Sequence, residues 1–333
     1  MSKLNRDVLY LIFQELHDKK FCKHLNFKQI VRILDICIPF KEHKKIKNEI
    51  IGLFINENTK FTHLYIPIQF EFQIHLIPGA QHCFSELEFL SCNTDDVLAG
   101  LTEICKSIKI LELTIGQFNN KSEIVRLIEI PKKLSHICLT LYHESQCKIL
   151  ENSMMKRANA IKHFKITNSS KLSSFVNLIS TFVNLRILEL DVLASLIENT
   201  SGSLIEIKIY YYGYNIDNEN NKRIIQAIYQ NCPNLKYLKL LIRNSNIVEL
   251  EQLLINSRSS PTSRHPMLLQ LMSFTFNCID LMDLIETYKR EGIIKKCGIS
   301  RIIADEYSEY QIREDFEDFE WIQNKVFWQT QQT

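Results

Sequence analysis

Glycine and proline are scarce in this sequence, with 8 and 7 residues respectively among 333. A sandwich or barrel of many short strands needs turn residues at close intervals, so their scarcity argues against that class. An excess of charge of one sign is lacking as well, because the formal net charge is +2. This balance provides no electrostatic basis for binding nucleic acid or an anionic membrane, and we expect neither partner.

Segments that would direct the chain into a membrane are also missing from the pattern. The first residues lead into an amphipathic stretch, not into the apolar core of a signal peptide. The longest uncharged, apolar-rich window runs from Ser173 to Leu185 and is too short to span a bilayer. The ten cysteines are scattered without a C-x-x-C pair, which is typical of buried reduced thiols. We therefore expect a protein of the cytoplasm or the nucleus.

Catalytic and cofactor-binding motifs are absent too. The sequence contains none of the short motifs of zinc peptidases, P-loop enzymes, dinucleotide-binding folds or serine hydrolases. The ten histidines lack metal-ligand spacing. The adjacent His82 and Cys83 are expected to have a structural role, not to form a catalytic dyad. We therefore expect no enzymatic activity, no metal site and no cofactor.

What the sequence does contain is a recurring strand pattern. In the stretch 84–93, Phe84 is followed three and five positions later by Leu87 and Phe89. This spacing is that of the strand core of a leucine-rich repeat, whose apolar residues point inward. The pattern recurs with its middle residue at Leu64, Leu87, Leu111, Ile137, Phe164, Leu188, Ile207, Leu238 and Phe274. The first five intervals are 23 to 27 residues, within the range of this repeat class.

Between these cores, apolar residues recur at helical spacing, for example in 97–104, 124–128 and 224–229. Each repeat is thus predicted to be a strand, a turn, a helix and a return, and stacked repeats share one core. The predicted fold class is α/β, a leucine-rich-repeat solenoid (horseshoe) with a short α-helical N-terminal region. The array becomes irregular after residue 190, where one interval is short and another contains a polar break at 257–265.

The first segment of the chain has a single apolar face. Its apolar residues recur at spacings of three and four, and they are Leu4, Val8, Leu9, Ile12, Phe13 and Leu16. The stretch MSKLNRDVLYLIFQEL resembles the opening of an F-box, and with the repeats it resembles large fungal families of F-box/leucine-rich-repeat proteins. The resemblance implies that these residues contact the Skp1-type adaptor of an SCF-type ubiquitin ligase. Beyond Lys20 the Val and Trp of a complete F-box are absent, so the motif is truncated.

The sequence divides into four parts. Residues 1–20 are a partial F-box-like helix, and 21–58 are a helical connector or N-terminal cap. A basic run at 41–47 is better interpreted as a solvated linker and helix start than as a nuclear signal or anion patch. Residues 59–300 are the solenoid. The tail, 301–333, is acidic and aromatic, and it is interpreted as a disordered terminus, with an interaction segment or a late helix as alternatives.

Strand alternation also predicts which side chains form the concave surface, because the neighbours of inward residues point outward. The candidate partner-binding residues are Tyr65, Glu86, Glu88, Glu112, His136, His163, Lys165, Glu189, Lys208, Tyr237 and Lys239. They are acidic in the first half of the array and more basic in the second. Such a surface suits a protein or peptide partner of mixed charge.

Two functions follow from these observations. The first is a non-enzymatic substrate-recognition adaptor of an SCF-type ubiquitin ligase, which would bind an unidentified target protein on the concave face. The connection to a ubiquitin ligase is implied by the F-box resemblance alone. The alternative is a leucine-rich-repeat interaction scaffold without a ligase connection, which the truncated F-box favours.

Overall fold

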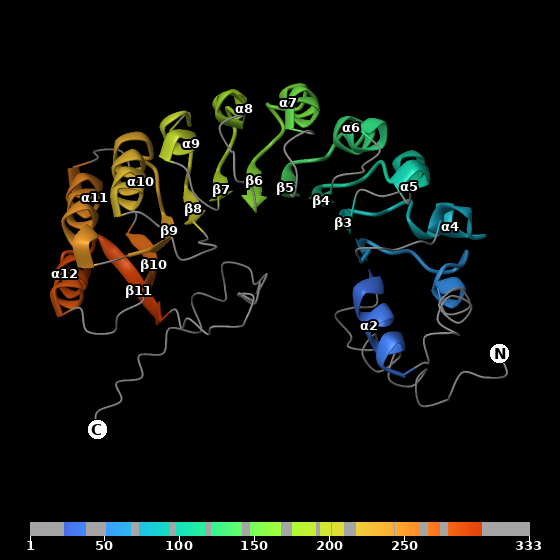
Figure 1. Ribbon diagram of the computed structural model, residues 1–333, viewed down its shortest axis with the longest axis horizontal. Helices are drawn as coiled ribbons and strands as arrows, with labels where there is room; N and C mark the ends of the chain where they lie inside the picture. Colours follow the sequence, from blue (N-terminus) through green and yellow to red (C-terminus); the bar gives the residue numbers. More distant parts are fainter. Residues whose placement is uncertain are drawn as a thin grey trace. The chain divides into compact units, whose positions relative to one another are not determined.

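Short strands alternate with helices along the chain, as the computed structural model shows (Figure 1). The structure describes residues 23–37, 51–67, 73–93, 98–116, 121–141, 147–167, 175–190, 194–200, 202–209, 218–242, 244–259, 266–273 and 279–301. The chain divides into two compact units, Met1–Asn184 and Leu185–Thr333. Each unit contains strands and helices of its own.

In the first unit the strands pair in chain order, each parallel to the next. They are β1 (His24–Asn26), β2 (His63–Tyr65), β3 (Phe89–Asn93), β4 (Ile110–Ile115), β5 (His136–Leu141) and β6 (His163–Thr167). The helical segments are α2 (Phe27–Cys37), η2 (Ile74–Leu76), α4 (Ala80–Cys83), α5 (Leu98–Ile104), α6 (Lys121–Glu129), α7 (Cys147–Met155) and α8 (Val176–Thr181). Parallel neighbours need a crossover connection. Helices α4 to α8 lie on one side of β3 to β6 (Figure 1).

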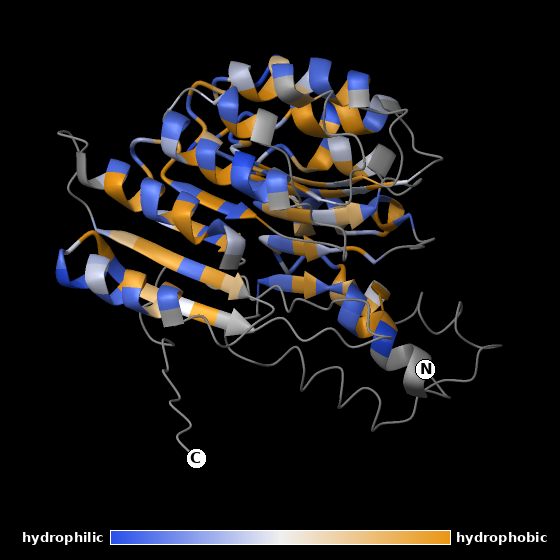
Figure 2. Ribbon diagram, turned by 60° about the vertical axis from the view of Figure 1, so that its left-hand side comes forward, coloured by the Kyte–Doolittle hydropathy of each residue, from blue (hydrophilic) through white to orange (hydrophobic). Residues whose placement is uncertain are grey.

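The core of the first unit lies between the strands and these helices. In β4, Leu111 and Leu113 are buried, whereas the alternating Ile110, Glu112 and Thr114 are half-buried. This alternation is that of a strand with one face in the core. Helix α6 buries Ile124, Leu127 and Ile128, which lie three and four positions apart on one helical face. Hydrophobic and hydrophilic residues occupy different faces of the helices (Figure 2). Each fully buried aliphatic side chain contributes about 2 kcal/mol to stability.

The second unit repeats this arrangement. Its strands, again parallel and paired in chain order, are β7 (Ile187–Leu190), β8 (Glu206–Ile209), β9 (Tyr237–Leu241), β10 (Met267–Ser273) and β11 (Ile294–Arg301). Its helical segments are α9 (Ala194–Glu198), α10 (Asn218–Asn231), η5 (Asn244–Asn246), α11 (Ile247–Ser259) and α12 (Ile279–Arg290). The short interval predicted between two cores holds the five-residue α9.

Most of the predicted core is confirmed. The predicted middle residues that are 1% exposed or less are Leu64, Leu87, Leu111, Ile137, Phe164, Leu188, Ile207 and Leu238. The predicted helices between the cores are present as α5, α6, α7, α9, α10, α11 and α12. The described part of the chain is therefore an α/β structure with parallel strands and intervening helices, as the sequence predicts.

The predicted register is wrong in the repeat that contains β3. Leu90, not Leu87, lies opposite Leu64 of β2 and Leu111 of β4. Leu87 and Phe84 are also buried, but they precede the strand. Two overlapping patterns fit the required spacing here, one beginning at Phe84 and one at Leu87. Backbone pairing with both neighbouring strands selects the second pattern, because a shifted strand would lose its ladder of hydrogen bonds.

A similar correction applies to the repeat that contains β10. The prediction places its middle residue at Phe274, but Leu269 lies opposite Leu238 of β9. Leu271 then lies opposite Leu240, so the strand core is five residues earlier in the chain. Phe274 itself lies outside the described residues. A run of alternating apolar residues from 267 onward allows several registers, and only the neighbouring strand decides between them.

Two strands are missing from the prediction. β1 lies in residues 21–58, for which the sequence predicts a helical connector or N-terminal cap, and its Leu25 is 1% exposed opposite Leu64. β11 follows α12 and buries Cys297 opposite Leu269. Three residues are too few to show a period in the sequence, and the charged Lys295 and Lys296 interrupt the apolar pattern of β11. Both strands become recognisable only through their partners.

Two apolar residues that were predicted to lie on core-facing helical faces are exposed instead. Val248 in α11 is 65% exposed, because the inward face of this helix consists of Leu250, Leu253 and Leu254. Leu53 is 41% exposed. Short apolar runs leave the direction of a helical face ambiguous, and tertiary packing decides it.

Several predictions fall outside the described residues. They include the F-box-like segment with Leu4, Val8, Leu9, Ile12, Phe13 and Leu16, the basic run 41–47, and the tail from 302 to 333. Among the residues that are described, no helix combines the length and the apolar character needed to cross a membrane.

Candidate functional site

The face of the strands opposite α4 to α8, called here the front face, carries the side chains that alternate with the core. In the first unit its first row contains His24, His63, Phe89, Ile110, His136 and His163. Its second row contains Asn26, Tyr65, Ser91, Glu112, Cys138 and Lys165. Because the pairing is in register, the backbones of neighbouring residues in one row are separated by the distance between adjacent strands, about 4.8 Å. Each row is therefore a continuous line of neighbouring side chains.

Four aromatic residues from three strands form a cluster on this face. The rings of His24 and His63 are stacked with centroids 3.8 Å apart, and those of His63 and Phe89 are stacked at 5.4 Å. The Tyr65 ring is tilted against Phe89 at 4.7 Å. We call His24, His63, Phe89 and Tyr65 the ring cluster. Phe89 is buried beneath its neighbours, and the other three side chains are half-buried.

The ring of His63 also has a hydroxyl neighbour. The Thr62 hydroxyl lies 2.9 Å from Nδ1 of His63 and 3.3 Å from the backbone carbonyl oxygen of Lys23. This hydroxyl therefore links the His63 ring to the residue that precedes β1.

The second histidine pair lies further along the same row. The rings of His136 and His163 meet edge to face with centroids 5.3 Å apart. Nδ1 of His136 lies 2.8 Å from the Ser135 hydroxyl, so a hydroxyl residue precedes and contacts the histidine here as it does at His63. Burial, followed by the charge of His24, lowers the pKa of His63 to about 4, against an opposing effect of Glu88. Burial, followed by the charges of His163 and Lys162, lowers the pKa of His136 to about 4.

These pKa shifts predict that acid destabilises the first unit. The unfolded chain binds protons on His63 and His136 below about pH 6.5, whereas the folded rings bind them only near pH 4. The stabilisation is complete above pH 6.5 and is lost as the pH falls from 6.5 to 4. We expect about 1 kcal/mol per ring, much less than the full shift implies, because both rings are partly exposed to solvent. Urea midpoints at pH 7 and pH 4.5 measure the effect.

The double variant H63Q/H136Q is the matched control for this prediction. It keeps polar side chains at both positions but removes the titrating groups. Its loss of stability between pH 7 and pH 4.5 should be smaller than that of the unaltered protein by about 2 kcal/mol. An identical loss in both proteins would show that other groups cause the acid sensitivity.

The acidic part of the front face lies beside the ring cluster. Burial, followed by the negative charge of Glu112, raises the pKa of Tyr65. Between these two positions in the second row lies Ser91, which is small and buried. The ammonium group of Lys28, from α2, donates a 3.5 Å hydrogen bond to the Ser91 hydroxyl. The edge of the ring cluster therefore combines a carboxylate, a hydroxyl and one lysine.

In the second unit, the strand positions that alternate with the core, called here its front face, carry a buried charge network. Lys208 Nζ lies 2.7 Å from a carboxylate oxygen of Glu206 and 3.3 Å from one of Glu189. The same ammonium lies 5.9 Å from the centre of the Tyr237 ring, whose hydroxyl donates to Gln270 at 2.6 Å. Desolvation lowers the pKa of Lys208, but the two carboxylates outweigh it, and the pKa is raised. Such a network is satisfied internally and offers little unused hydrogen-bonding capacity.

The structure places most of the predicted partner-binding residues on the front face. In the first unit these are Tyr65, Glu112, His136, His163 and Lys165, and in the second they are Glu189, Lys208, Tyr237 and Lys239. The exposed fraction differs among these side chains. Lys165, Glu189 and Tyr237 are only 8%, 5% and 2% exposed, whereas Tyr65, Glu112 and both histidines are half-buried.

The predicted positions of Glu86 and Glu88 are wrong. The corrected register of β3 assigns Phe89 and Ser91 to the two rows, and both glutamates precede the strand. Glu86 forms a 2.6 Å ion pair with Lys60, and Glu88 forms one with Lys109 at 2.6 Å. Pairs this exposed are worth little, because solvent screens them. Of the three glutamates that were predicted to lie close together on this face, only Glu112 therefore lies in one of its rows.

Sequence reasoning missed several residues of this face as site candidates. His24 and Lys28 were missed because β1 is too short to be recognised, and Phe89 was assigned to the core by the wrong register. Glu206 and Gln270 were missed although each lies beside a predicted residue. The residues become identifiable once the pairing of the strands is known.

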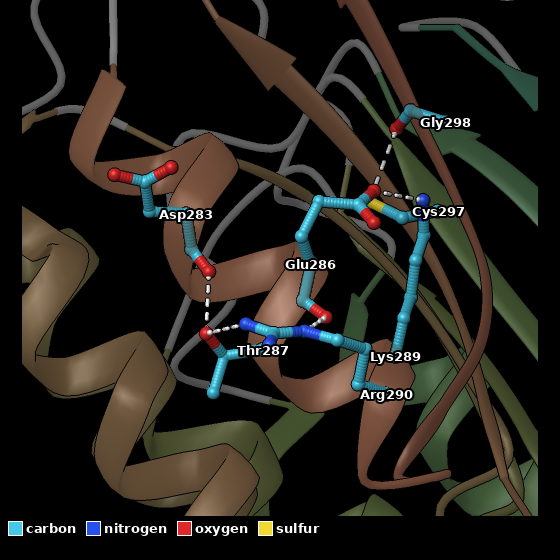
Figure 3. A network of polar contacts seen from close by, with 7 residues as sticks. All are labelled: Asp283, Glu286, Thr287, Lys289, Arg290, Cys297 and Gly298. Atoms are coloured by element: carbon cyan, nitrogen blue, oxygen red, sulfur yellow. Dashed lines mark hydrogen bonds and ion pairs between the residues drawn. The ribbon is translucent and has the colours of Figure 1, made fainter.

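Buried cysteines provide no reactive site. Burial, the first cause in each case, raises the pKa of Cys105, Cys232 and Cys297 to about 12, so these thiols stay protonated near neutral pH. Figure 3 shows Cys297 of β11 beside the last turns of α12, where Lys289 Nζ donates to Glu286 at 2.8 Å. Within the described residues, no group of three or more His, Cys, Asp or Glu side chains is arranged to hold a metal ion.

No protein-family model matches this chain, and none of the curated proteins matches it.

Proposed function

We propose that this protein is a recognition subunit of an SCF-type ubiquitin ligase, without enzymatic activity of its own, which binds a target protein on the front face of a leucine-rich-repeat solenoid. The observation that carries the recognition half is the pair of in-register rows of polar and aromatic side chains on parallel strands. A solenoid exposes such rows as a long binding surface. The regular alternation of strands and helices within each unit supports the horseshoe class.

The ligase half of the proposal comes from the N-terminal segment. Its apolar residues at helical spacing resemble the opening of an F-box, which docks on a Skp1-type adaptor. A subunit of this kind needs no catalytic group, because holding the target at the ligase raises its effective concentration there. The proposal places the protein in the cytoplasm or nucleus, where the ligase acts.

Capture of purified Skp1 by the full chain tests this proposal. We expect binding that the double variant L9K/F13K weakens more than tenfold, because charges on the apolar face would have to be buried in the interface. Q14K is the matched control, since Gln14 lies between the apolar positions of the same segment. It should bind Skp1 within about twofold of the unaltered chain.

The second candidate function is an interaction scaffold without a ligase connection. The absence of the F-box Val and Trp beyond Lys20 favours it. Failure of the unaltered chain to capture Skp1, with retained folding by circular dichroism, would exclude the ligase subunit and leave the scaffold. Equal capture by L9K/F13K and Q14K would show that a different surface contacts Skp1.

A further inference from the structure

A group of cations lies at the edge of the first unit where β4, β5 and β6 begin. They come from the turns that lead into these strands, and they are Lys106, Lys132, Lys133, Arg157 and Lys162. We call this group the basic edge, and we infer that it binds an acidic segment of the target protein, rich in aspartate or glutamate. This inference rests on the proposed recognition function and names the chemistry of the target.

The first argument is that these turns lie side by side. The backbone N–H of Ser135 donates to the carbonyl of Lys109 at 3.0 Å, and the N–H of Lys162 donates to the carbonyl of Ser135 at 2.8 Å. The backbones that enter β4, β5 and β6 are therefore separated by about 4.8 Å from one strand to the next. Lys106 and Lys132 each stand four residues before their strand, so they occupy equivalent places in neighbouring repeats.

The guanidinium of Arg157 joins the same edge. Its Nη2 atom donates to the backbone carbonyls of Pro131 at 2.9 Å and of Lys132 at 3.0 Å. Its Nε atom is buried without a hydrogen-bond partner. Arg157 therefore holds the turn that carries Lys132 and Lys133, and it adds a positive charge there without a carboxylate beside it.

The second argument is that the charge of the basic edge is not balanced. The neighbouring carboxylates pair with other cations, since Glu88 lies 2.6 Å from Lys109 and Glu129 lies 2.8 Å from Lys156. In the part of the chain that the structure describes, no ion pair joins a carboxylate to any of the five cations. The carboxyl ends of α5, α6 and α7 lie beside these turns, and their dipoles supply about −1.5 charges together. Five cations exceed that charge, so an anion from outside the unit is favoured.

The basic edge is accessible and continuous with the front face. All four of its lysines are exposed. The charge of Lys162, after burial and the charge of His163, contributes to the lowered pKa of His136 in the first row. A target segment that lies on the front face can therefore extend onto the basic edge.

The residue types favour carboxylates of a peptide over the phosphates of a nucleic acid. Four of the five cations are lysines, which act as point charges and suit carboxylates on separate side chains. Two-pronged recognition of phosphate needs arginine, and Arg157 directs its Nη2 atom to backbone carbonyls. The formal net charge of the chain is +2, which provides no wider basic surface to follow a nucleic-acid backbone.

A titration of the full chain with two short peptides tests the inference. The probes are fluorescently labelled Gly-Glu-Glu-Glu-Glu-Gly-amide and the same peptide with glutamine in place of glutamate, followed by fluorescence anisotropy at low salt. We expect the glutamate peptide to bind at least tenfold more tightly than the glutamine peptide. K132E/K133E should weaken binding of the glutamate peptide at least tenfold, and K132E alone at least fourfold, because both replace attraction by repulsion.

K148E is the matched control for K132E. Lys148 is an exposed lysine at the start of α7, whereas the basic edge lies at the end of that helix. K148E should change the affinity for the glutamate peptide less than twofold. Unfolding midpoints identify any variant that fails to fold, and the neutral K132Q/K133Q should then weaken binding at least threefold.

Four results would overturn the inference. They are equal binding of the two peptides, no detectable binding of either, equal effects of K132E and K148E, and tighter binding of a ten-nucleotide single-stranded DNA than of the glutamate peptide. The last result would assign the basic edge to nucleic acid.

The two proposals fail in different ways. The variants of the basic edge lie outside the N-terminal segment, so Skp1 capture should be unchanged by K132E/K133E. Loss of glutamate selectivity with intact Skp1 capture would reject the acidic target and leave the ligase subunit in place. Selective binding of the glutamate peptide without Skp1 capture would leave the basic edge as the site of an interaction scaffold.

Discussion

Replacing Gly79 by alanine should destabilise the first unit by about 2 to 5 kcal/mol. Gly79 has φ +90°, a conformation that L-residues adopt only at a cost of about 1 to 2 kcal/mol. An added Cβ would also lie 2.7 Å from the carbonyl carbon of Asn56 and 2.9 Å from the nitrogen of Glu57. These are backbone atoms, so the overlap adds about 1 to 3 kcal/mol to the conformational cost.

The backbone of Asn56 cannot easily move away, because it is held from both sides. Its N–H donates to Sγ of Cys83 at 3.2 Å, and its carbonyl accepts a 2.8 Å hydrogen bond from the same thiol. Cys83 is itself fully buried in α4. Relief of the overlap would therefore break these contacts, which adds to the cost of the substitution.

Gly292 provides the matched control for this prediction. It has φ +74° at the end of α12, but an added Cβ would find nothing within 4 Å. G292A should therefore cost only the conformational part, about 1 to 2 kcal/mol. Hydrogen exchange of the strand amides in each unit measures both variants, and it assigns the change to the unit concerned. A loss in G79A no larger than in G292A would show that the Asn56 backbone adjusts freely.

Replacing Phe164 by alanine should have a comparable effect, about 3 to 5 kcal/mol. Phe164 is fully buried in β6, with ring centroids of Phe175 and Phe182 at 6.3 and 5.5 Å. Alanine would leave a cavity among these rings, which are themselves buried at the two ends of α8. The rings at both ends of α8 would lose their contact with the strand. Thermal or urea unfolding followed by circular dichroism measures the loss.

F164L and V183A complete this test. Leucine fills most of the volume and should cost less than half as much as alanine. Val183 is 53% exposed beside the same helix, so V183A should change stability by less than about 0.5 kcal/mol. A cost for F164A similar to that of V183A would mean that the three rings do not form a packed cluster.

The front face shows how far sequence reasoning reaches. Alternation around well-separated cores correctly places Tyr65 and Glu112 in one row and His136 and His163 in the other. It fails at Glu86 and Glu88, because the stretch from Phe84 to Cys92 contains two overlapping patterns of equal quality. It also misses His24, whose strand is three residues long and lies in a part that looked helical. Each failure concerns register or pairing, which depends on a second strand.

The sequence by itself determined the α/β class, most of the buried strand positions and the helices between them. These properties follow from apolar periodicity, which is a local feature of the chain. Only the tertiary structure decided which of two patterns β3 uses, that β1 and β11 join the strands, and that the His24, His63, Phe89 and Tyr65 rings meet. The physical reason is that hydrogen bonds between strands and ring contacts across them are made by residues distant in the sequence. The free energy of these contacts therefore cannot be read from any single stretch of the sequence.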